Sequence, residues 1–335
     1  MGGSHCDAIL AIRCRAPRTW WANTTESMMK ADHENTNPKI KTILIPVDGS
    51  PQGDEAVRSV QAFSPPNRIL LLHCFSIPQL GYPGTGMSVG REFSEAAEKE
   101  LRKEGSRILK RAASLLPAVC GEASQHLEIG DTASVILSMA QKESADLILI
   151  GSRGLGVLKE HVLGSVSHRV ATHAPCPTLI VKFPLMPLNN ILIPIEHPLD
   201  AEWAIEWLAQ KPFQKTPHLS LLHVIPFAQP VLPIGALLPD AWKKELQTGS
   251  AHFTQEVTNT LTTLGYQTDR FVEPGAPSSI IQEYISRIQP QLVLMGTYDR
   301  PALNRLAHGS VSHTTIHHAP CSVLLLKGRS DVLTT

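Results

Sequence analysis

The chain alternates short aliphatic runs with longer segments whose apolar positions recur at helical spacing. Runs such as KTILIPV, RILLLHCFSI and DLILI have the length of buried β-strands. In the first half of the chain the helical spacing predicts helices over residues 54–63, 91–116, 132–142 and 159–173, and the Gly- and Pro-rich stretch 77–90 is expected to be loop. Near-continuous Ile, Leu and Val strands between amphipathic helices predict a parallel sheet covered on both faces, an α/β fold.

The second half of the chain repeats the first. LEIGDTASVI recurs as VEPGAPSSII, HVLGSVSH as RLAHGSVSH, and HAPCPTLIVK as HAPCSVLLLK. Equivalent positions such as Gly151 and Gly296 lie 145 residues apart. We therefore predict two tandem, doubly wound domains at residues 40–183 and 190–328, each a mostly five-stranded parallel sheet of Rossmann-like type, joined by the short linker LMPLNN.

Residues 1–39 form an extension that has no counterpart in the second copy. The segment carries Trp20 and Trp21 without a surrounding apolar pattern, and it has no hydrophobic periodicity. We expect it to be disordered, with Met28 and Met29 as alternative translation starts.

Composition excludes several classes of partner. Lys and Arg total 30 and Asp and Glu total 30, so no net field attracts nucleic acid, and an aromatic content of 5% offers little for base stacking. No apolar run approaches the ~18 residues that a membrane helix needs. The six cysteines form no C-x-x-C pair, which is typical of reduced core residues in a cytoplasmic protein rather than of disulfides or a zinc site.

Three glycines carry the strongest candidate chemistry. Gly151 ends the strand DLILI, Gly154 follows it, and Gly164-Ser165 begins a later helical turn. Glycines after a strand let a ligand approach the backbone amides, and a helix start adds further donors and a positive dipole end. The pattern favours the phosphates of a nucleotide, the alternative being that the glycines only shape turns.

Two other residues fall at the carboxyl end of a predicted strand, Asp48 and Cys74. Ligands of open parallel sheets bind at these strand ends, so Asp48, Cys74 and Gly151 are expected to converge. The sequence Asp-Gly-Ser is also typical of a turn after a strand, so the alternative is that Asp48 only stabilises this turn.

The spacing G-x2-G-x9-G-[ST] resembles the nucleotide-binding loop of the ATP-binding branch of the universal stress protein family. KTILIPVDGS, the His73-Cys74 pair and HAPCPTLIVK also match the family's pattern, so the resemblance covers about residues 40–183. It implies a fold like that of the adenine nucleotide alpha hydrolases and ATP, with or without Mg²⁺, in the first domain. The implied binding residues are Asp48 for ribose or adenine, Pro46, Val47 and Cys74 for adenine, and Gly151, Arg153, Gly154, Gly164, Ser165 and Val166 for the phosphates.

The resemblance implies a regulatory or interaction module with unidentified protein partners, not an enzyme, although slow ATP hydrolysis stays open. One alternative is an ATP-cleaving enzyme of the adenine nucleotide alpha hydrolase group, whose S-G-G-x-D-S-type loop is replaced here by VDGSPQGDEA. Another is a stress-family scaffold that binds no nucleotide. Neither a P-loop nor a G-x-G-x-x-G after the first strand occurs.

The second copy is expected to have lost the site. Its loop reads GTYDRPALNRLAHGS, in which Asp299 replaces the second glycine, and Glu196 stands at the position of Asp48. Single-domain members of the family are usually dimers joined through their final strands. By resemblance, PTLIVK and SVLLLK would pair within this chain, since an open strand edge is a liability.

Histidines offer a weaker signal. His313 and His317, at i and i+4, could face together on a helix as metal ligands do, but no third ligand is evident and no metal site is expected. His73 and His223, each within an apolar strand, are expected to be hydrogen-bonded core residues.

Overall fold

The structure is a computed structural model that describes residues 40–77, 87–118, 120–154, 163–183, 185–225, 240–297 and 310–327. The extension at residues 1–39, with its expected disorder and alternative starts, lies outside the described residues.

Ten strands form one sheet, in the order β3-β2-β1-β4-β5-β10-β9-β6-β7-β8. The first half of the chain supplies β1 (Thr42–Pro46), β2 (Arg68–Phe75), β3 (Glu122–Ile129), β4 (Leu147–Gly151) and β5 (Thr178–Val181). The second half supplies β6 (Asn190–Ile195), β7 (His218–Ile225), β8 (Thr268–Pro274), β9 (Leu292–Thr297) and β10 (Ser322–Lys327). Neighbours within each half are parallel, which confirms the predicted α/β fold of two tandem five-stranded sheets.

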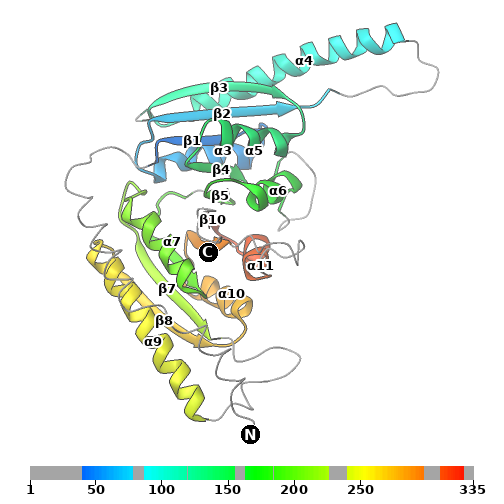
Figure 1. Cartoon of the computed structure of the whole chain (residues 1–335). Helices are drawn as coiled ribbons and strands as arrows, with labels where there is room; N and C mark the ends of the chain where they lie inside the picture. Colours follow the sequence, from blue (N-terminus) through cyan, green and yellow to red (C-terminus); the bar gives the residue numbers. More distant parts are fainter. Residues whose placement is uncertain are drawn as a thin grey trace. The chain divides into compact units, whose positions relative to one another are not determined.

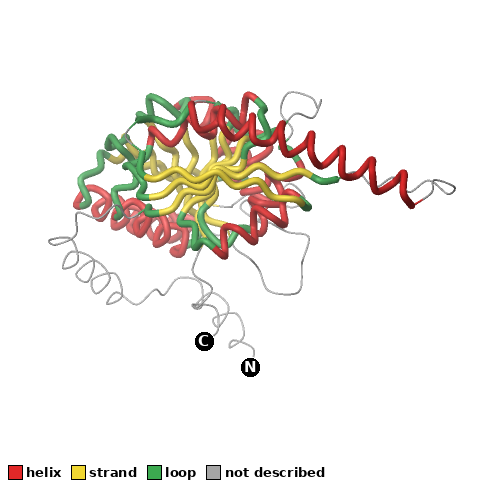
Figure 2. The backbone as a smooth tube through the Cα atoms, turned by 90° about the horizontal axis from the view of Figure 1, so that it is seen from above, coloured by secondary structure: helices red, strands yellow, loops and turns green. Residues whose placement is uncertain are grey.

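Helices cover both faces of the sheet, as the view along it shows (Figure 2). The first half contains α3 (Pro51–Arg58), continued by a short 3-10 turn (Ser59–Ala62), then α4 (Met87–Ser114), α5 (Thr132–Lys142) and α6 (Ser165–His173). The second half contains α7 (Pro198–Ala209), α9 (Asp240–Thr263), α10 (Pro277–Ile288) and α11 (Ser310–His318). α7 and α9 correspond to α3 and α4, as the duplication requires (Figure 1).

Three predicted helix starts were wrong. α3 begins at Pro51 rather than at 54, because Ser50 caps the helix there. α4 begins at Met87, so the last four residues of the expected loop 77–90 are helical; residues 78–86 lie outside the described part. α6 begins at Ser165 rather than at 159, because Gly164 has an extended backbone (φ −64°, ψ 150°) and serves as the N-cap.

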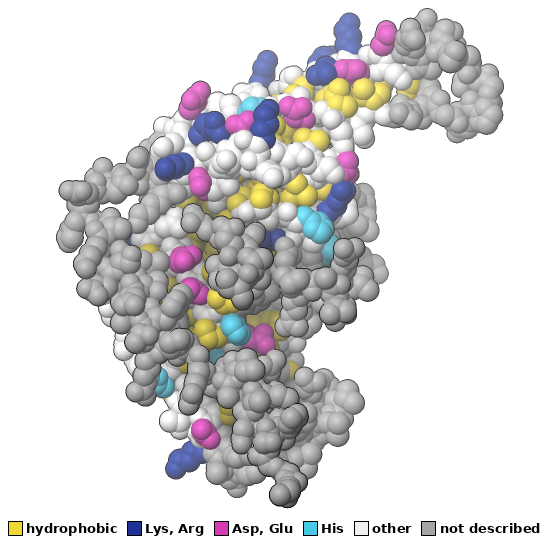
Figure 3. All heavy atoms as spheres, viewed as in Figure 1, with side chains coloured by type: hydrophobic (Ala, Val, Ile, Leu, Met, Phe, Trp, Pro, Cys, Tyr) yellow, Lys and Arg dark blue, Asp and Glu magenta, His cyan; other side chains and the backbone are white. Residues whose placement is uncertain are grey.

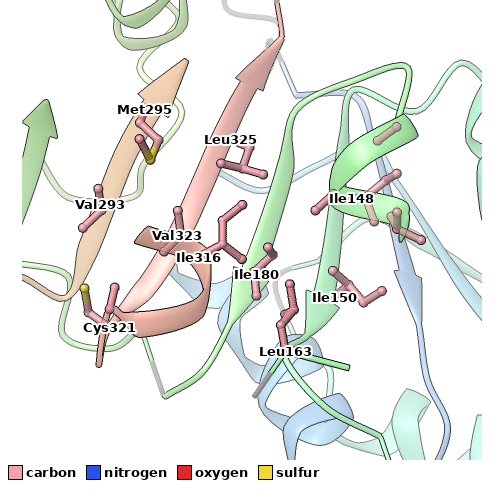
Figure 4. Packing of buried hydrophobic residues seen from close by; sticks show 14 of the residues in the cluster. Ile148, Ile150, Leu163, Ile180, Val293, Met295, Ile316, Cys321, Val323 and Leu325 are labelled. Atoms are coloured by element: carbon pink, nitrogen blue, oxygen red, sulfur yellow. The ribbon is translucent and has the colours of Figure 1, made fainter. Parts of the chain in front are cut away.

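The two halves meet through their last strands. β10 pairs with β5 in antiparallel fashion, with Leu324 opposite Leu179, which confirms the predicted pairing of PTLIVK with SVLLLK. Buried side chains from β4, β5, β10 and β9 form one apolar cluster that continues across this junction (Figure 4). A second antiparallel bridge joins Phe63 to Phe213, whose ring centroids lie 5.5 Å apart. The junction is therefore built as a two-fold interface between similar halves.

The predicted linker is partly buried and is hydrogen-bonded to the second half. Leu185 and Leu188 are buried, and Asn190 already belongs to β6. The backbone N–H groups of Asn189 and Asn190 donate to the Oε1 atom of Gln291. The connection between the halves is thus short and anchored.

None of the described helices is long and apolar enough to cross a membrane. On the face in Figure 3, Lys and Arg side chains intermix with Asp and Glu along the edge formed by α4 and β3. On α4 these charges form ion pairs one turn apart, such as Glu98 with Arg102 at 2.7 Å.

Candidate functional site

The loops after β1 and β4 converge, because these strands are parallel neighbours with Leu44 opposite Ile148. The half-buried Asp48 follows β1, and the exposed Gly154 follows β4. A Cβ atom added at Gly154 would collide with Oδ2 of Asp48, so the carboxylate lies directly against the backbone of this glycine. The structure therefore brings together the acidic residue and the second glycine that the sequence singled out.

A serine ties the two loops to each other. Oδ1 of Asp48 accepts a hydrogen bond from the backbone N–H of Ser50 at 3.0 Å, and Gly49 turns the chain with φ +82°. The buried hydroxyl of Ser50 accepts from the N–H of Gly53 at 3.1 Å, capping α3, and donates to the carbonyl of Arg153 at 3.4 Å. Asp48 thus has the turn role that the sequence left open, and Oδ2 faces the loop after β4.

The three glycines of the motif have different surroundings. At Gly151 an added Cβ would lie only 2.8 Å from the backbone carbon of Gln52, so close packing of α3 on β4 requires glycine here. At Gly164 an added Cβ would make ordinary contacts, the nearest being 3.5 Å to the carbonyl oxygen of Ser152. Packing with the described residues explains the glycine at 151 but leaves the glycine at 164 without a steric reason.

The N-terminus of α6 lies beside these loops. The N–H of Gly164 donates to the carbonyl of Ser152 at 2.9 Å, and the buried hydroxyl of Ser167 donates to the carbonyl of Gly151 at 2.7 Å. Among the described residues no side chain forms a cap hydrogen bond at this helix start, where Ser165 is exposed and Val166 half-buried. First-turn amides without intrahelical acceptors, at the positive end of the helix dipole, make this a suitable place for an anion. The half-buried Arg153 adds a cation on the connecting loop.

The apolar side of the site is built on β1 and β2. Pro46 pairs with Leu72, and Val47 donates its N–H to the carbonyl of Leu72 at 2.8 Å. Nδ1 of the buried His73 hydrogen-bonds to the carbonyl of Val47 at 2.7 Å, which confirms the expected core role of this histidine.

Cys74 is half-buried beside Glu128 of β3. Burial, and to a lesser extent the charge of Glu128, raise the pKa of the Cys74 thiol to about 12. The thiol is therefore neutral and suits an apolar contact rather than nucleophilic chemistry.

The second domain has the same strand arrangement, but different residues lie around the equivalent position. Nδ1 of His223 hydrogen-bonds to the carbonyl of Ile195 at 2.9 Å, as His73 does in the first domain. The third residue of α7, however, is the buried Asp200, where α3 has Gly53. Its carboxylate accepts from the N–H of Glu196 at 3.0 Å and would collide with a Cβ atom on Gly296. An acidic group thus lies beside the strand end that would receive the ligand.

Sequence reasoning missed Asp200, although aligning the prolines that begin α3 and α7, Pro51 and Pro198, would have placed it opposite Gly53. Asp299 and the rest of loop 298–309 lie outside the described residues, so the predicted effect of Asp299 stays a prediction.

Comparison with known proteins agrees with this architecture. The model of the family described as "Universal stress protein family" matches residues 39–182 and again residues 187–327. This chain belongs to the universal stress protein family. Its two matches make it a tandem member, as the internal repeat predicted.

Relatives match either one domain or both. A universal stress protein of Thermus aquaticus is 37% identical over 144 residues, which is 42% of this chain and 98% of the relative. One from Mycolicibacterium smegmatis is 25% identical over 301 residues, 86% of this chain and 97% of the relative. The crystal structure of a universal stress protein from Archaeoglobus fulgidus aligns with a TM-score of 0.59 at 20% identity, covering 88% of this chain and all of that one, which supports the fold alone.

Proposed function

We propose that this universal stress protein binds ATP in its first domain, with or without Mg²⁺, and acts as a regulatory or interaction module. The observation that carries the proposal is the contact of the Asp48 carboxylate with the backbone of Gly154, beside the N-terminus of α6, where no described side chain forms a cap hydrogen bond. Three segments that are distant in sequence supply complementary chemistry at one edge of the sheet, the place where parallel sheets bind ligands.

Each part of a nucleotide has a suitable counterpart. Amides of Ser165 and Val166 at the start of α6, together with the guanidinium of Arg153, would bind the phosphates. Asp48 would accept hydrogen bonds from the ribose or the adenine. Pro46, Val47 and the neutral thiol of Cys74 would contact the adenine ring, with Gly151 and Gly164 allowing close approach of the backbone.

Gly164 gives the sharpest test of ATP binding. Since an added Cβ there makes only ordinary contacts, Gly164→Ala should leave the fold intact while filling space that a phosphate needs. Gly164→Ser should weaken binding more, because its hydroxyl would accept from the first-turn amides as N-cap serines do. Gly249→Ala is the matched control, since a Cβ at Gly249 meets nothing within 4 Å.

Isothermal titration calorimetry with ATP on ligand-free protein should show one site per chain, weakened at least tenfold by each Gly164 variant and unchanged in Gly249→Ala. Asp48→Ala should weaken binding by about 1–3 kcal/mol through lost hydrogen bonds. Mass spectrometry of ligand released from native protein should detect an adenine nucleotide. Wild-type affinity in both Gly164 variants and in Asp48→Ala would reject this site.

A further inference from the structure

Three histidines from the two halves of the chain meet at the domain junction. His168 lies on α6 of the first domain, and His313 and His317 lie on α11 of the second, the two helices that neighbour each other beside β5 and β10 (Figure 1). One ring nitrogen of each histidine lies within 4.8 Å of one from each of the others. The ring centroids of His313 and His317 are 4.4 Å apart, and that of His168 is 5.5 and 5.7 Å from them.

The internal two-fold relation explains the meeting. His168 and His313 are equivalent residues, the last of the SVSH repeated in both copies. The antiparallel pairing of β5 with β10 brings the two helices, and therefore these two side chains, to the same place. His317 comes one helical turn after His313 and so shares its face of α11. The third ligand that the sequence did not reveal is thus supplied by the other domain.

The spacing suits a transition metal ion. Tetrahedral Zn²⁺ with Zn–N distances of about 2.0–2.1 Å holds its nitrogen ligands about 3.3 Å apart. Nitrogens already within 4.8 Å of one another reach this separation by small side-chain rotations. The i, i+4 histidine pair on a helix is a familiar part of zinc sites.

The burial of the cluster also fits a bound ion. His168 and His317 are both half-buried between the two domains. Nε2 of His317 is buried, and in the described part of the chain it has no hydrogen-bond partner, which costs free energy unless something binds it. His313 is exposed, leaving access for a water as a fourth ligand.

We propose that His168, His313 and His317 form a Zn²⁺ site that links the two domains. Three imidazole ligands with a water at the fourth position suit Zn²⁺. None of the three histidines is among the residues proposed to bind the nucleotide, and a cation bound here would stabilise the folded junction by mass action.

Other charged groups near the cluster moderate its affinity. The positive charge of Lys182 lies close enough to His317, and that of a protonated His173 close enough to His168, to act on these rings, and His318 does the same for His317. The ammonium of Lys182 is turned toward the end of α11, where Nζ donates to the carbonyl of Ala319 at 2.6 Å. A bound Zn²⁺ ion must therefore overcome some repulsion from these positive groups. In a site of three imidazoles it does so through the metal–nitrogen bonds.

The test uses untagged, chelator-treated full-length protein titrated with ZnCl₂ by calorimetry, and with CoCl₂ by visible absorption. Because residues 1–39 contain further histidines and cysteines, the readout is the difference between variants. His317→Gln and His168→Gln should each weaken the junction site at least tenfold and remove its tetrahedral Co²⁺ absorption. His318→Gln and His173→Gln replace exposed histidines on the same helices and should keep both.

Zn²⁺ should also raise the melting temperature of the wild type and of Gly164→Ala, but not that of His317→Gln. Metal-free circular dichroism melts show whether each variant is folded. Wild-type Zn²⁺ affinity and Co²⁺ spectrum in folded His168→Gln and His317→Gln would overturn the proposal, as would equal losses in the His318 and His173 controls.

Discussion

At the scale of single residues, the three glycines of the motif have different roles. Gly151 is required by the backbone of Gln52, Gly154 by the carboxylate of Asp48, and Gly164 by neither. The sequence predicted where these residues lie along the chain and that they follow one strand. It could not separate packing from binding, because that distinction depends on what a Cβ atom would meet in three dimensions.

Gly151→Ala should therefore act on stability. The added methyl forces α3 away from β4, because its Cβ would lie 2.8 Å from a backbone atom, and such overpacking costs about 1–3 kcal/mol. Gly164→Ala should cost less than about 1 kcal/mol, the effect of a poorer N-cap. Urea denaturation of both variants measures the difference, and equal losses would show that the packing distinction is wrong.

In the second domain, acidic groups should prevent ATP binding. A carboxylate about 4 Å from a phosphate costs about 4 kcal/mol at an effective dielectric of 20. In a Gly154→Val background that silences the first domain, we expect no ATP binding. Weak binding should return when Asp299→Gly, Glu196→Asp and Asp200→Asn are combined, the last keeping an acceptor for the cap. Isothermal titration calorimetry measures the affinity for ATP. Tight binding in the Gly154→Val variant without the other substitutions would contradict the prediction.

At the scale of elements, prediction succeeded where local signals agree. α5 runs from Thr132 to Lys142 as predicted, since Asp131 caps it by accepting from the N–H of Ser134. The start of α4 was predicted too late, because Gly90 in its first turn is a residue typical of loops. The start of α6 was also missed, since the apolar spacing before Gly164 does not require a helix.

Two lysines join the ends of helices across the junction. Nζ of Lys182, after β5, donates to the carbonyl of Ala319 after α11, and Nζ of Lys327, at the end of β10, donates to the carbonyl of Thr172 in α6, both at 2.6 Å. Each cation lies at a helix C-terminus, where the dipole favours positive charge. Neither hydrogen bond could be predicted from the sequence, because the prediction requires knowing which helix of one half lies beside which strand of the other.

Lys182 gives a prediction about pH. Burial lowers its pKa from 10.5 to about 8, so between these values the unfolded chain binds more protons than the folded one. The free energy of unfolding should therefore gain a rising contribution as pH increases from about 8 to about 10.5. Lys182→Met should lack this contribution. Urea denaturation of both proteins across this range tests it, and parallel pH dependences would contradict the assignment.

At the scale of the whole molecule, the internal repeat was enough to predict two domains, and the family resemblance added the pairing of their final strands. The contact of Phe63 with Phe213 and the histidine cluster were not predictable, because both arise from the two-fold relation between the halves rather than from spacing along the chain. Asp200 was missed for a different reason, a one-residue shift between the copies before α7.

Cleavage between the halves should leave them associated. Leu185 and Leu188 are buried, so the native linker should resist limited proteolysis. A protease site inserted after Pro187 should allow cutting, yet the fragments should co-elute in size-exclusion chromatography because the antiparallel strands and the Phe63–Phe213 contact persist. Separation into two stable monomers would contradict the paired-edge interpretation.

The antiparallel junction of β5 with β10 also changes how the protein responds to dilution. A dimer of separate chains dissociates as its concentration falls, and its melting temperature falls with it. Here the connection holds the two halves at an effective concentration of the order of millimolar, whatever the amount of protein in the cell. The partnership is fixed at synthesis, so one half can diverge while always keeping the other as its partner.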